Sequence, residues 1–211
     1  MRIFPPIDRI VDQADQTLRT VFVRTPIDPY PDTIPREEGE LTAAERALEA
    51  RLMRVNHAGE VAAQALYQGH ALYAVDAPIR AAMRSAGRDE LNHLHWTSAR
   101  LKELHSHRSY LTPLWYAGAL AIGAGTALFG DKISLSFMAE TERQVVDHLQ
   151  GHLAKLPQTD HKSRAILEHM VRDEARHATQ AMAAGGQPLP AAIRLAMRLA
   201  AKVMTQTAFW I

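Results

Sequence analysis

Two short segments of the sequence each place a carboxylate and an imidazole three residues apart. They are Glu90 with His93 and Glu174 with His177, and each glutamate directly follows Arg-Asp. On an α-helix, residues at i and i+3 lie on one face, so a glutamate and a histidine with this spacing can bind the same cation. Either motif alone is more often a pair of solvated surface residues, so the interpretation depends on what accompanies them.

The chain repeats the surroundings of these motifs. A glutamate followed eight residues later by Gln-Gly-His occurs at Glu60 and again at Glu142, and these glutamates precede the second glutamates by 30 and 32 residues. This self-similarity predicts a duplicated helix pair, in which the first helix supplies one Glu and the second supplies Glu-x-x-His. The predicted metal ligands, which are also the candidate catalytic residues, are Glu60, Glu90, His93, Glu142, Glu174 and His177.

This set of ligands suits a pair of divalent ions. Four ionised carboxylates offset the four positive charges of two such ions inside a bundle of low dielectric constant. Oxygen and nitrogen ligands favour iron or manganese. Glu90 and Glu174 are the candidates to bridge the ions, since each lies beside its own histidine, and the other two glutamates would each bind one ion. Asp89 and Asp173 are either solvated surface residues or groups that orient the histidine of the opposite helix.

Length and composition exclude several classes of protein. A chain of 211 residues with 47% hydrophobic and 22% charged residues fits one globular, helix-rich domain. The net charge of +1 and the lack of a long basic run exclude nucleic acid as an expected partner. Without cysteine, disulfides, thiolate iron–sulfur ligands and a cysteine-built zinc site are excluded. The first residues, MRIFPPIDRIVDQ, lack the apolar core expected of a secretory signal.

Periodicity and turn residues predict an all-α fold. A short amphipathic helix is expected at 5–20, and the prolines of 24–41 predict an extended linker. Four long helices, each with a predicted ligand near its middle, are expected at about 42–74, 76–105, 131–157 and 160–185. They fit a four-helix bundle with additional short N-terminal and amphipathic C-terminal helices. We expect 1–41 to be an extension with a linker and 42–211 to be the catalytic domain.

Capping residues set the expected helix starts. Thr42 and Glu45 form a capping box, Asp160 is a predicted N-cap, and Thr112 before Pro113 is predicted as a cap followed by the first helical residue.

Two segments suggest contact with lipid. Residues 109–130 carry no charge, although their glycines and proline argue against an ordinary transmembrane helix, and a buried bundle helix is the alternative. After Glu174 the chain has no acidic residue, while Arg194, Arg198 and Lys202 recur every four residues beside an apolar face that ends in Phe-Trp-Ile. A basic amphipathic helix of this kind is typical of peripheral membrane contact, and packing in a homo-oligomer is the competing interpretation.

Several motifs together resemble the demethoxyubiquinone hydroxylase family of ubiquinone biosynthesis. They are RVNHAGE at 54–60, PLWYAGALAIGAGTALFG at 113–130, the segment around Glu142 and RDEARH at 172–177. The resemblance covers about 50–205 and implies a ferritin-like bundle with non-haem di-iron, held by the six residues that match the family's ligands. It also places His148 near the quinone site, whereas Leu149 stands where some relatives have Tyr. Residues 1–41 are not explained by it.

The resemblance further implies an activity and a location. The family hydroxylates the ring of a polyprenylated demethoxyubiquinol with O₂, at two iron ions, using an external reductant. We accordingly expect a peripheral protein on the cytoplasmic face of the inner membrane that meets other ubiquinone-biosynthesis proteins. The residues leave two other functions open: a ferritin-like iron store, or a manganese catalase or peroxidase. The electron source also stays open among a reductase, nicotinamide and the quinol, because no dinucleotide-binding motif is visible.

Overall fold

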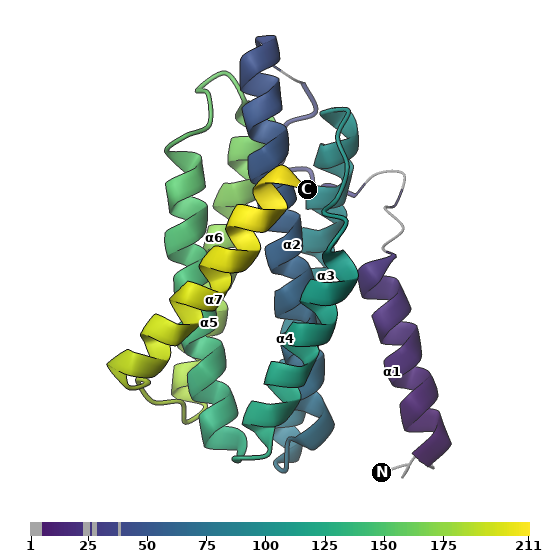
Figure 1. Ribbon diagram of the computed structural model, residues 1–211, viewed down its shortest axis with the longest axis vertical. Coiled ribbons are helices and arrows are strands. Elements are labelled where there is room, and N and C mark those ends of the chain that lie inside the picture. The colour runs from purple at the N-terminus through teal and green to yellow at the C-terminus, as the bar shows by residue number, and fades with distance from the viewer. Residues whose placement is uncertain (1–5, 23–25, 27–28, 38) are drawn as a thin grey trace.

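The computed structural model describes residues 6–22, 26, 29–37 and 39–211, and every regular element in these ranges is a helix (Figure 1). The helices are α1 (Pro6–Val21), α2 (Ala43–Tyr73), α3 (Ala77–Glu103), α4 (Thr112–Ala127), α5 (Asp131–Leu153), α6 (His161–Ala183) and α7 (Ala191–Trp210). The predicted all-α fold is confirmed. Within the predicted linker 24–41, residues 24, 25, 27, 28 and 38 lie outside the described part of the chain.

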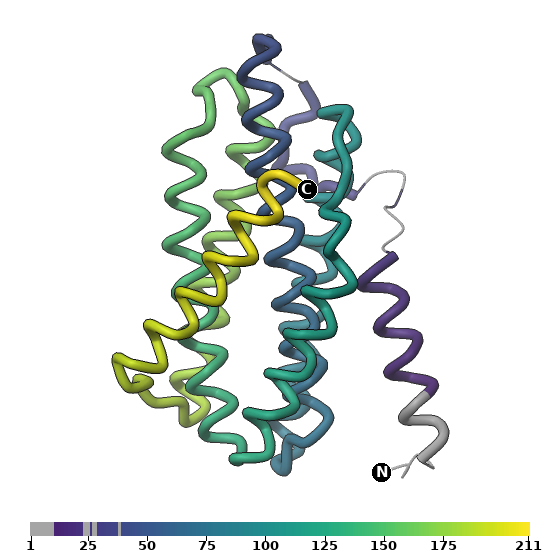
Figure 2. The backbone as a smooth tube through the Cα atoms, in the orientation of Figure 1, coloured from purple at the N-terminus to yellow at the C-terminus, as the bar shows by residue number. Residues whose placement is uncertain are grey.

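The four long helices form a ferritin-like bundle of two hairpins. α2 packs against α3, α5 packs against α6, and contacts between α2 and α5 and between α3 and α6 close the bundle. α4 packs along the outside of α2, and α7 crosses obliquely over α2 and α5, as the tube view shows (Figure 2). α1 lies at the edge of the molecule, against α2 and α4.

Two of the three predicted caps, Thr42 and Asp160, are confirmed. Thr42 accepts from the Glu45 backbone N–H at 3.3 Å while the Glu45 carboxylate accepts from the Thr42 N–H at 2.8 Å. Asp160 likewise accepts from the Ser163 N–H at 2.9 Å. The prediction of Thr112 as an N-cap is wrong. Its hydroxyl donates to the Ser109 carbonyl at 2.6 Å instead of accepting from the helix, and the cap position falls one residue earlier, at Leu111.

Two glycines allow α4 to approach α2 closely. A Cβ at Gly69 would lie 2.5 Å from the Leu120 carbonyl oxygen, and one at Gly123 would lie 2.5 Å from the Leu66 carbonyl oxygen. The inner face of α4 is therefore buried, whereas Leu114 and Ile122 of α4, and Leu128 and Phe129 directly after it, are exposed. Within the described residues no helix is both long and apolar enough to cross a membrane.

One carboxylate joins the two hairpins at the end of the bundle where α2 gives way to α3. Asp131, the first residue of α5, accepts from the backbone N–H of Val75 at 3.0 Å and of Asp76 at 2.7 Å. These two donors belong to the turn between α2 and α3, the two helices of the other hairpin. These two hydrogen bonds therefore fix the position of one hairpin along the bundle axis relative to the other.

A buried ionic network occupies the opposite end of the bundle. The Arg100 guanidinium on α3 lies 2.8 Å from a Glu49 oxygen on α2 and 3.2 Å from an Asp160 oxygen at the start of α6, and all three side chains are fully buried. Ser163 also donates a hydrogen bond to Glu49. Burial and the neighbouring Asp160 raise the pKa of Glu49 to about 8, although Arg100 opposes them.

The proline-rich segment before α2 packs on the bundle. Ile34 and Tyr30 belong to the same buried core cluster as Trp96 of α3. The Trp96 indole N–H donates to the Pro29 carbonyl at 2.8 Å. The described part of this segment therefore covers the core, which the prediction of an extended linker did not anticipate.

α1 attaches to the bundle through polar side chains. The Gln13 amide donates to the Gln68 side-chain oxygen at 3.2 Å and to the Tyr116 hydroxyl at 3.1 Å. Tyr116 also pairs with Thr17 at 2.8 Å and donates to Gln68 at 2.5 Å.

Candidate metal centre

The structure brings the six predicted ligand residues together in the middle of the bundle. Glu60 comes from α2, Glu142 from α5, and the two Glu-x-x-His motifs from α3 and α6, and all six side chains are buried. Within the described residues, two groups of four have ligand atoms that all lie within 4.8 Å of one another. These groups are Glu60, Glu90, His93 and Glu174, and Glu90, Glu142, Glu174 and His177.

The two groups share Glu90 and Glu174. This is the arrangement expected of two ions held by two bridging carboxylates, with one further glutamate and one histidine for each ion. The shared pair is the pair that the sequence singled out for bridging, and the reason is geometric: each of the two lies one helical turn before its own histidine.

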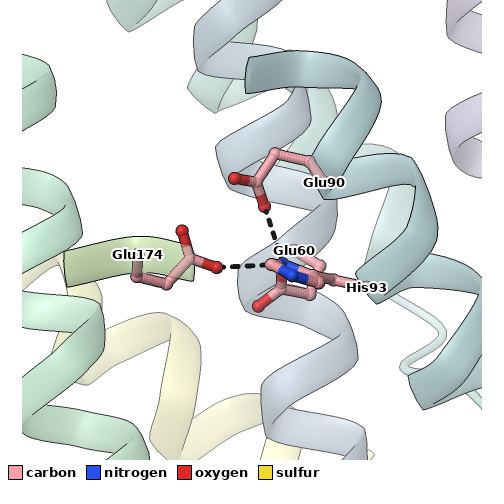
Figure 3. Close-up of side chains that lie close together, drawn as sticks. All are labelled: Glu60, Glu90, His93 and Glu174. Carbon is pink, nitrogen blue, oxygen red and sulfur yellow. Dashed lines mark hydrogen bonds and ion pairs between the residues drawn. The ribbon is translucent and has the colours of Figure 1, made fainter. Parts of the chain in front are cut away.

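In the first group, one ring nitrogen of His93 faces three carboxylates. Its Nδ1 lies 2.9 Å from an oxygen of Glu174, 3.2 Å from one of Glu60 and 3.5 Å from one of Glu90 (Figure 3). A single N–H at this nitrogen could point at only one of these oxygens. A cation between the nitrogen and the oxygens would satisfy all four groups.

The other ring nitrogen of each histidine points to an aspartate on the facing helix. His93 Nε2 lies 3.2 Å from Asp173, and His177 Nε2 lies 3.2 Å from Asp89. The arrangement is reciprocal between α3 and α6, and it matches one of the two interpretations that the sequence left open for these aspartates. An Nε2–H donated to the aspartate leaves Nδ1 as the ligand atom, which fixes the tautomer and the ring orientation.

Burial and crowding determine which of these groups hold protons. Burial raises the pKa of Glu60 and Glu142 well above the usual range, and nearby carboxylates raise that of Glu142 further. For Glu90, the attraction of the two nearby histidines outweighs burial and lowers the pKa. Burial opposes protonation of His93 and His177, but the carboxylates around them outweigh it and raise both pKa values, that of His177 to about 11.

The donor set fits a pair of divalent cations. Both oxygens of Glu90 and one oxygen each of Glu142 and Glu174 are buried without a hydrogen-bond partner. Leaving buried polar atoms unsatisfied is costly, and native proteins rarely do so unless a ligand completes the site. Carboxylates and imidazoles are ligands of iron and manganese.

One contact to this centre was not predicted from the sequence. The Tyr67 hydroxyl on α2 donates to a Glu142 oxygen at 2.6 Å, and the tyrosine ring is buried and edge-on to His177. The available signal was the spacing of Tyr67 seven residues after Glu60, which puts both on one face of α2.

Comparisons with known proteins identify the family of this chain. The family model of ubiquinone biosynthesis protein COQ7 matches residues 47–208. The chain belongs to this family. It is 50% identical to the 3-demethoxyubiquinol 3-hydroxylase of Nitrosospira multiformis over 98% of this chain and 100% of that protein. It is 52% identical to proteins of the same name from Burkholderia ambifaria, over 97% of this chain and 99% of the relative, and from Nitrosococcus oceani, over 97% and 96%.

The resemblance drawn from the motifs is therefore confirmed, and the match to the COQ7 family does not favour iron storage or a manganese catalase. The relatives align over nearly the whole chain, so the similarity extends into residues 1–41, beyond the motifs that suggested it.

A cavity leads from the surface to one side of this COQ7-family centre. It has a volume of about 470 Å³, lies between α2, α5 and α7, and is lined by Glu60, His148 and Leu149 among others. Arg198 and Lys202 of α7 also line it. The predicted substrate contact His148 is thus placed in the same cavity as the predicted ligand Glu60.

The histidine in this cavity has a buried neighbour. The His148 ring packs on the His152 ring with centroids 4.0 Å apart, and His152 Nδ1 lies 2.7 Å from the Asn56 side-chain oxygen. His148 Nε2 is buried and has no hydrogen-bond partner. Burial lowers the pKa of His148 to about 4, and Lys155 adds to the effect, so the imidazole is neutral near pH 7.

Proposed function

We propose that this chain is a non-haem di-iron monooxygenase that hydroxylates the ring of a polyprenylated demethoxyubiquinol, acting as a 3-demethoxyubiquinol 3-hydroxylase. The observation that carries the proposal is the pair of buried ligand groups sharing Glu90 and Glu174, in a chain that matches the COQ7 family over residues 47–208. In this proposal residues 42–211 form the catalytic unit.

Glu60, Glu90, His93, Glu142, Glu174 and His177 would hold two iron ions. The ions supply, when bound and reduced, the two-electron activation of O₂ that organic side chains lack. The balanced reaction converts a ring C–H, O₂, two electrons and two protons into a ring C–OH and water. The electrons come from an external reductant, whether a reductase, a nicotinamide or a quinol.

The protein's own residues would position and shield the reaction. Asp89 and Asp173 hold the two histidines with Nδ1 facing the carboxylates. Burial of the ligands keeps bulk water away from the centre, which strengthens the electrostatic interactions inside it.

The substrate ring would occupy the cavity between α2, α5 and α7. His148, neutral and without a partner at Nε2, can accept a hydrogen bond from a ring hydroxyl of the quinol. Leu149 adds an apolar wall where some relatives have Tyr, so no phenol at this position takes part in proton or electron transfer.

The polyprenyl tail explains why the cavity lies beside α7. Leu195, Leu199 and Val203 on α7 are exposed, as are Leu128 and Phe129 at the end of α4. Arg194, Arg198 and Lys202 provide cations for anionic lipid headgroups. We propose peripheral contact of this surface with the cytoplasmic face of the inner membrane, where the tail stays in lipid while the ring enters the protein.

Sedimentation with vesicles tests the membrane contact. We expect the protein to co-sediment with phosphatidylglycerol vesicles at low salt and to dissociate as salt increases, since exposed charges are screened. Leu199→Glu should weaken binding, and Val11→Glu on the exposed side of α1 is the control. If the wild type, Leu199→Glu and Val11→Glu all bind equally to neutral vesicles, this part of the proposal is contradicted. Self-association and contact with other ubiquinone-biosynthesis proteins stay predictions.

Quinone profiling tests the activity. Cells lacking this protein should accumulate demethoxyubiquinone, and the wild-type chain should restore ubiquinone whereas Glu174→Ala should not. Glu168→Ala on the same helix is the matched control, because that residue lies outside both ligand groups. Unchanged ubiquinone in the deletion strain, or peroxide turnover by a manganese-loaded protein without hydroxylation, would refute the proposal.

A further inference from the structure

The internal repeat makes one position of the metal centre differ between its two halves. Glu60 and Glu142 occupy equivalent places in α2 and α5, and the residue seven positions later is Tyr67 in the first repeat and Leu149 in the second. Seven residues are nearly two helical turns, so each of these side chains lies on the same face of its helix as the glutamate.

In the half that contains Glu142, the tyrosine fixes the carboxylate. The Tyr67 hydroxyl donates to Glu142 Oε1 at 2.6 Å, while Oε2 of the same carboxylate has no partner. The tyrosine ring also packs edge-on to His177, with centroids 6.2 Å apart. The phenol therefore contacts both residues that belong to this half alone, and it leaves the second carboxylate oxygen of Glu142 free to bind an ion.

The same ring closes this half toward the surface. A recess of about 260 Å³ beneath α1 is lined by Tyr67, Gln64 and Gln68, and Glu142 is not among the residues that line it. Tyr67 thus stands between the recess and the carboxylate that it holds.

In the half that contains Glu60, the equivalent residue, Leu149, cannot hold the glutamate with a hydrogen bond. Leu149 is buried and has no donor, so it leaves Glu60 without a phenol hydrogen bond. Glu60 and Leu149 instead both line the 470 Å³ cavity between α2, α5 and α7. One half is therefore fixed and closed, and the other half opens to the space proposed for the quinol ring.

We infer that Tyr67 is a positioning residue that makes the two metal positions inequivalent. It holds Glu142 as a fixed ligand of the Glu142–His177 position, and the Glu60–His93 position is the one that faces the substrate. The inference rests on the proposed di-iron function and deepens it, because it assigns substrate approach to one position of the pair.

Release of Co²⁺ from the full-length protein to a chelator tests this assignment without using activity. Tyr67→Phe removes only the hydroxyl. We expect it to release one of two Co²⁺ ions about 10–100-fold faster than the wild type, because losing a group that orients a ligand typically lowers metal affinity by that factor. The second ion should leave at the wild-type rate. Tyr116→Phe is the matched control, since its hydroxyl is also hydrogen-bonded and buried but contacts Gln68, outside the centre.

Loading the variant with Co²⁺ during purification keeps the test valid if the metal-free variant unfolds, because bound ions stabilise the native state. If Tyr67→Phe releases both ions at the wild-type rate, or releases both ions faster by the same factor, the inference is overturned while the di-iron proposal stays intact. Binding of fewer than two Co²⁺ ions by the wild type would instead refute the metal pair and the inference with it.

Discussion

Metal binding should displace protons from the centre, and their number follows from the structure. In the metal-free protein the pKa values of Glu60, Glu142, His93 and His177 are all raised. We expect each of these four groups to hold, near neutral pH, a proton that a metal ligand must lose. Loading two ions should then release about four protons, or about two per ion.

The pH dependence of affinity follows from that count. Release of about two protons per ion makes the affinity for each ion rise about 100-fold per pH unit near neutrality. Calorimetric titration with Co²⁺ in buffers of different ionisation enthalpy measures the proton number directly. His70→Gln is the control, because burial lowers the pKa of that histidine to about 4 and it has no such proton to lose. Release of fewer than one proton per ion would show that the site is already deprotonated, and the reasoning from burial would fail.

Three further predictions concern stability and ligand orientation. The pKa of His177 is raised from 6.5 to about 11 in the metal-free fold, so the stability that its protonated ring contributes is complete below pH 6.5 and disappears as the pH rises through 11. Thermal unfolding of the metal-free protein should show this loss, and a melting temperature that rises with alkaline pH would contradict the prediction. Asp173→Asn and Asp89→Asn should each weaken metal affinity about 10–100-fold in chelator competition, and unchanged affinity would mean that the aspartates are only surface residues. Arg100→Met leaves Glu49 and Asp160 buried without their cation and should lower the free energy of unfolding by about 3–5 kcal/mol in urea titration. The exposed Arg143→Met should change it by less than about 1 kcal/mol, and similar losses in both variants would refute the argument from burial.

The ligand set could be found from sequence because its geometry is local to each helix. The spacing of Glu90 and His93 puts both on one helical face whatever the rest of the chain does, and the repeat pairs them with Glu174 and His177. Helix starts at Thr42 and Asp160 are local for the same reason, since a cap bonds to a residue three positions later.

Features that depend on how helices cross could not be found in this way. The bond from Tyr67 to Glu142 joins residues 75 positions apart and exists only because α2 and α5 pack together. The burial of Ile34 depends on a segment without helical periodicity lying across the core. For α4, the sequence was compatible with either a buried bundle helix or a surface that contacts lipid. The structure shows that the helix has one buried and one exposed apolar face.

The hydrogen bonds from Val75 and Asp76 to Asp131 have a consequence for which loops of this protein tolerate changes in length. An extra residue in the turn at 74–76 would move its amide donors away from that carboxylate and allow one hairpin to slide along the other, separating Glu90 from Glu174. The connection at 184–190, between α6 and α7, follows the last predicted ligand. Insertions there should leave metal binding unchanged, so natural or engineered variation in loop length belongs at that connection.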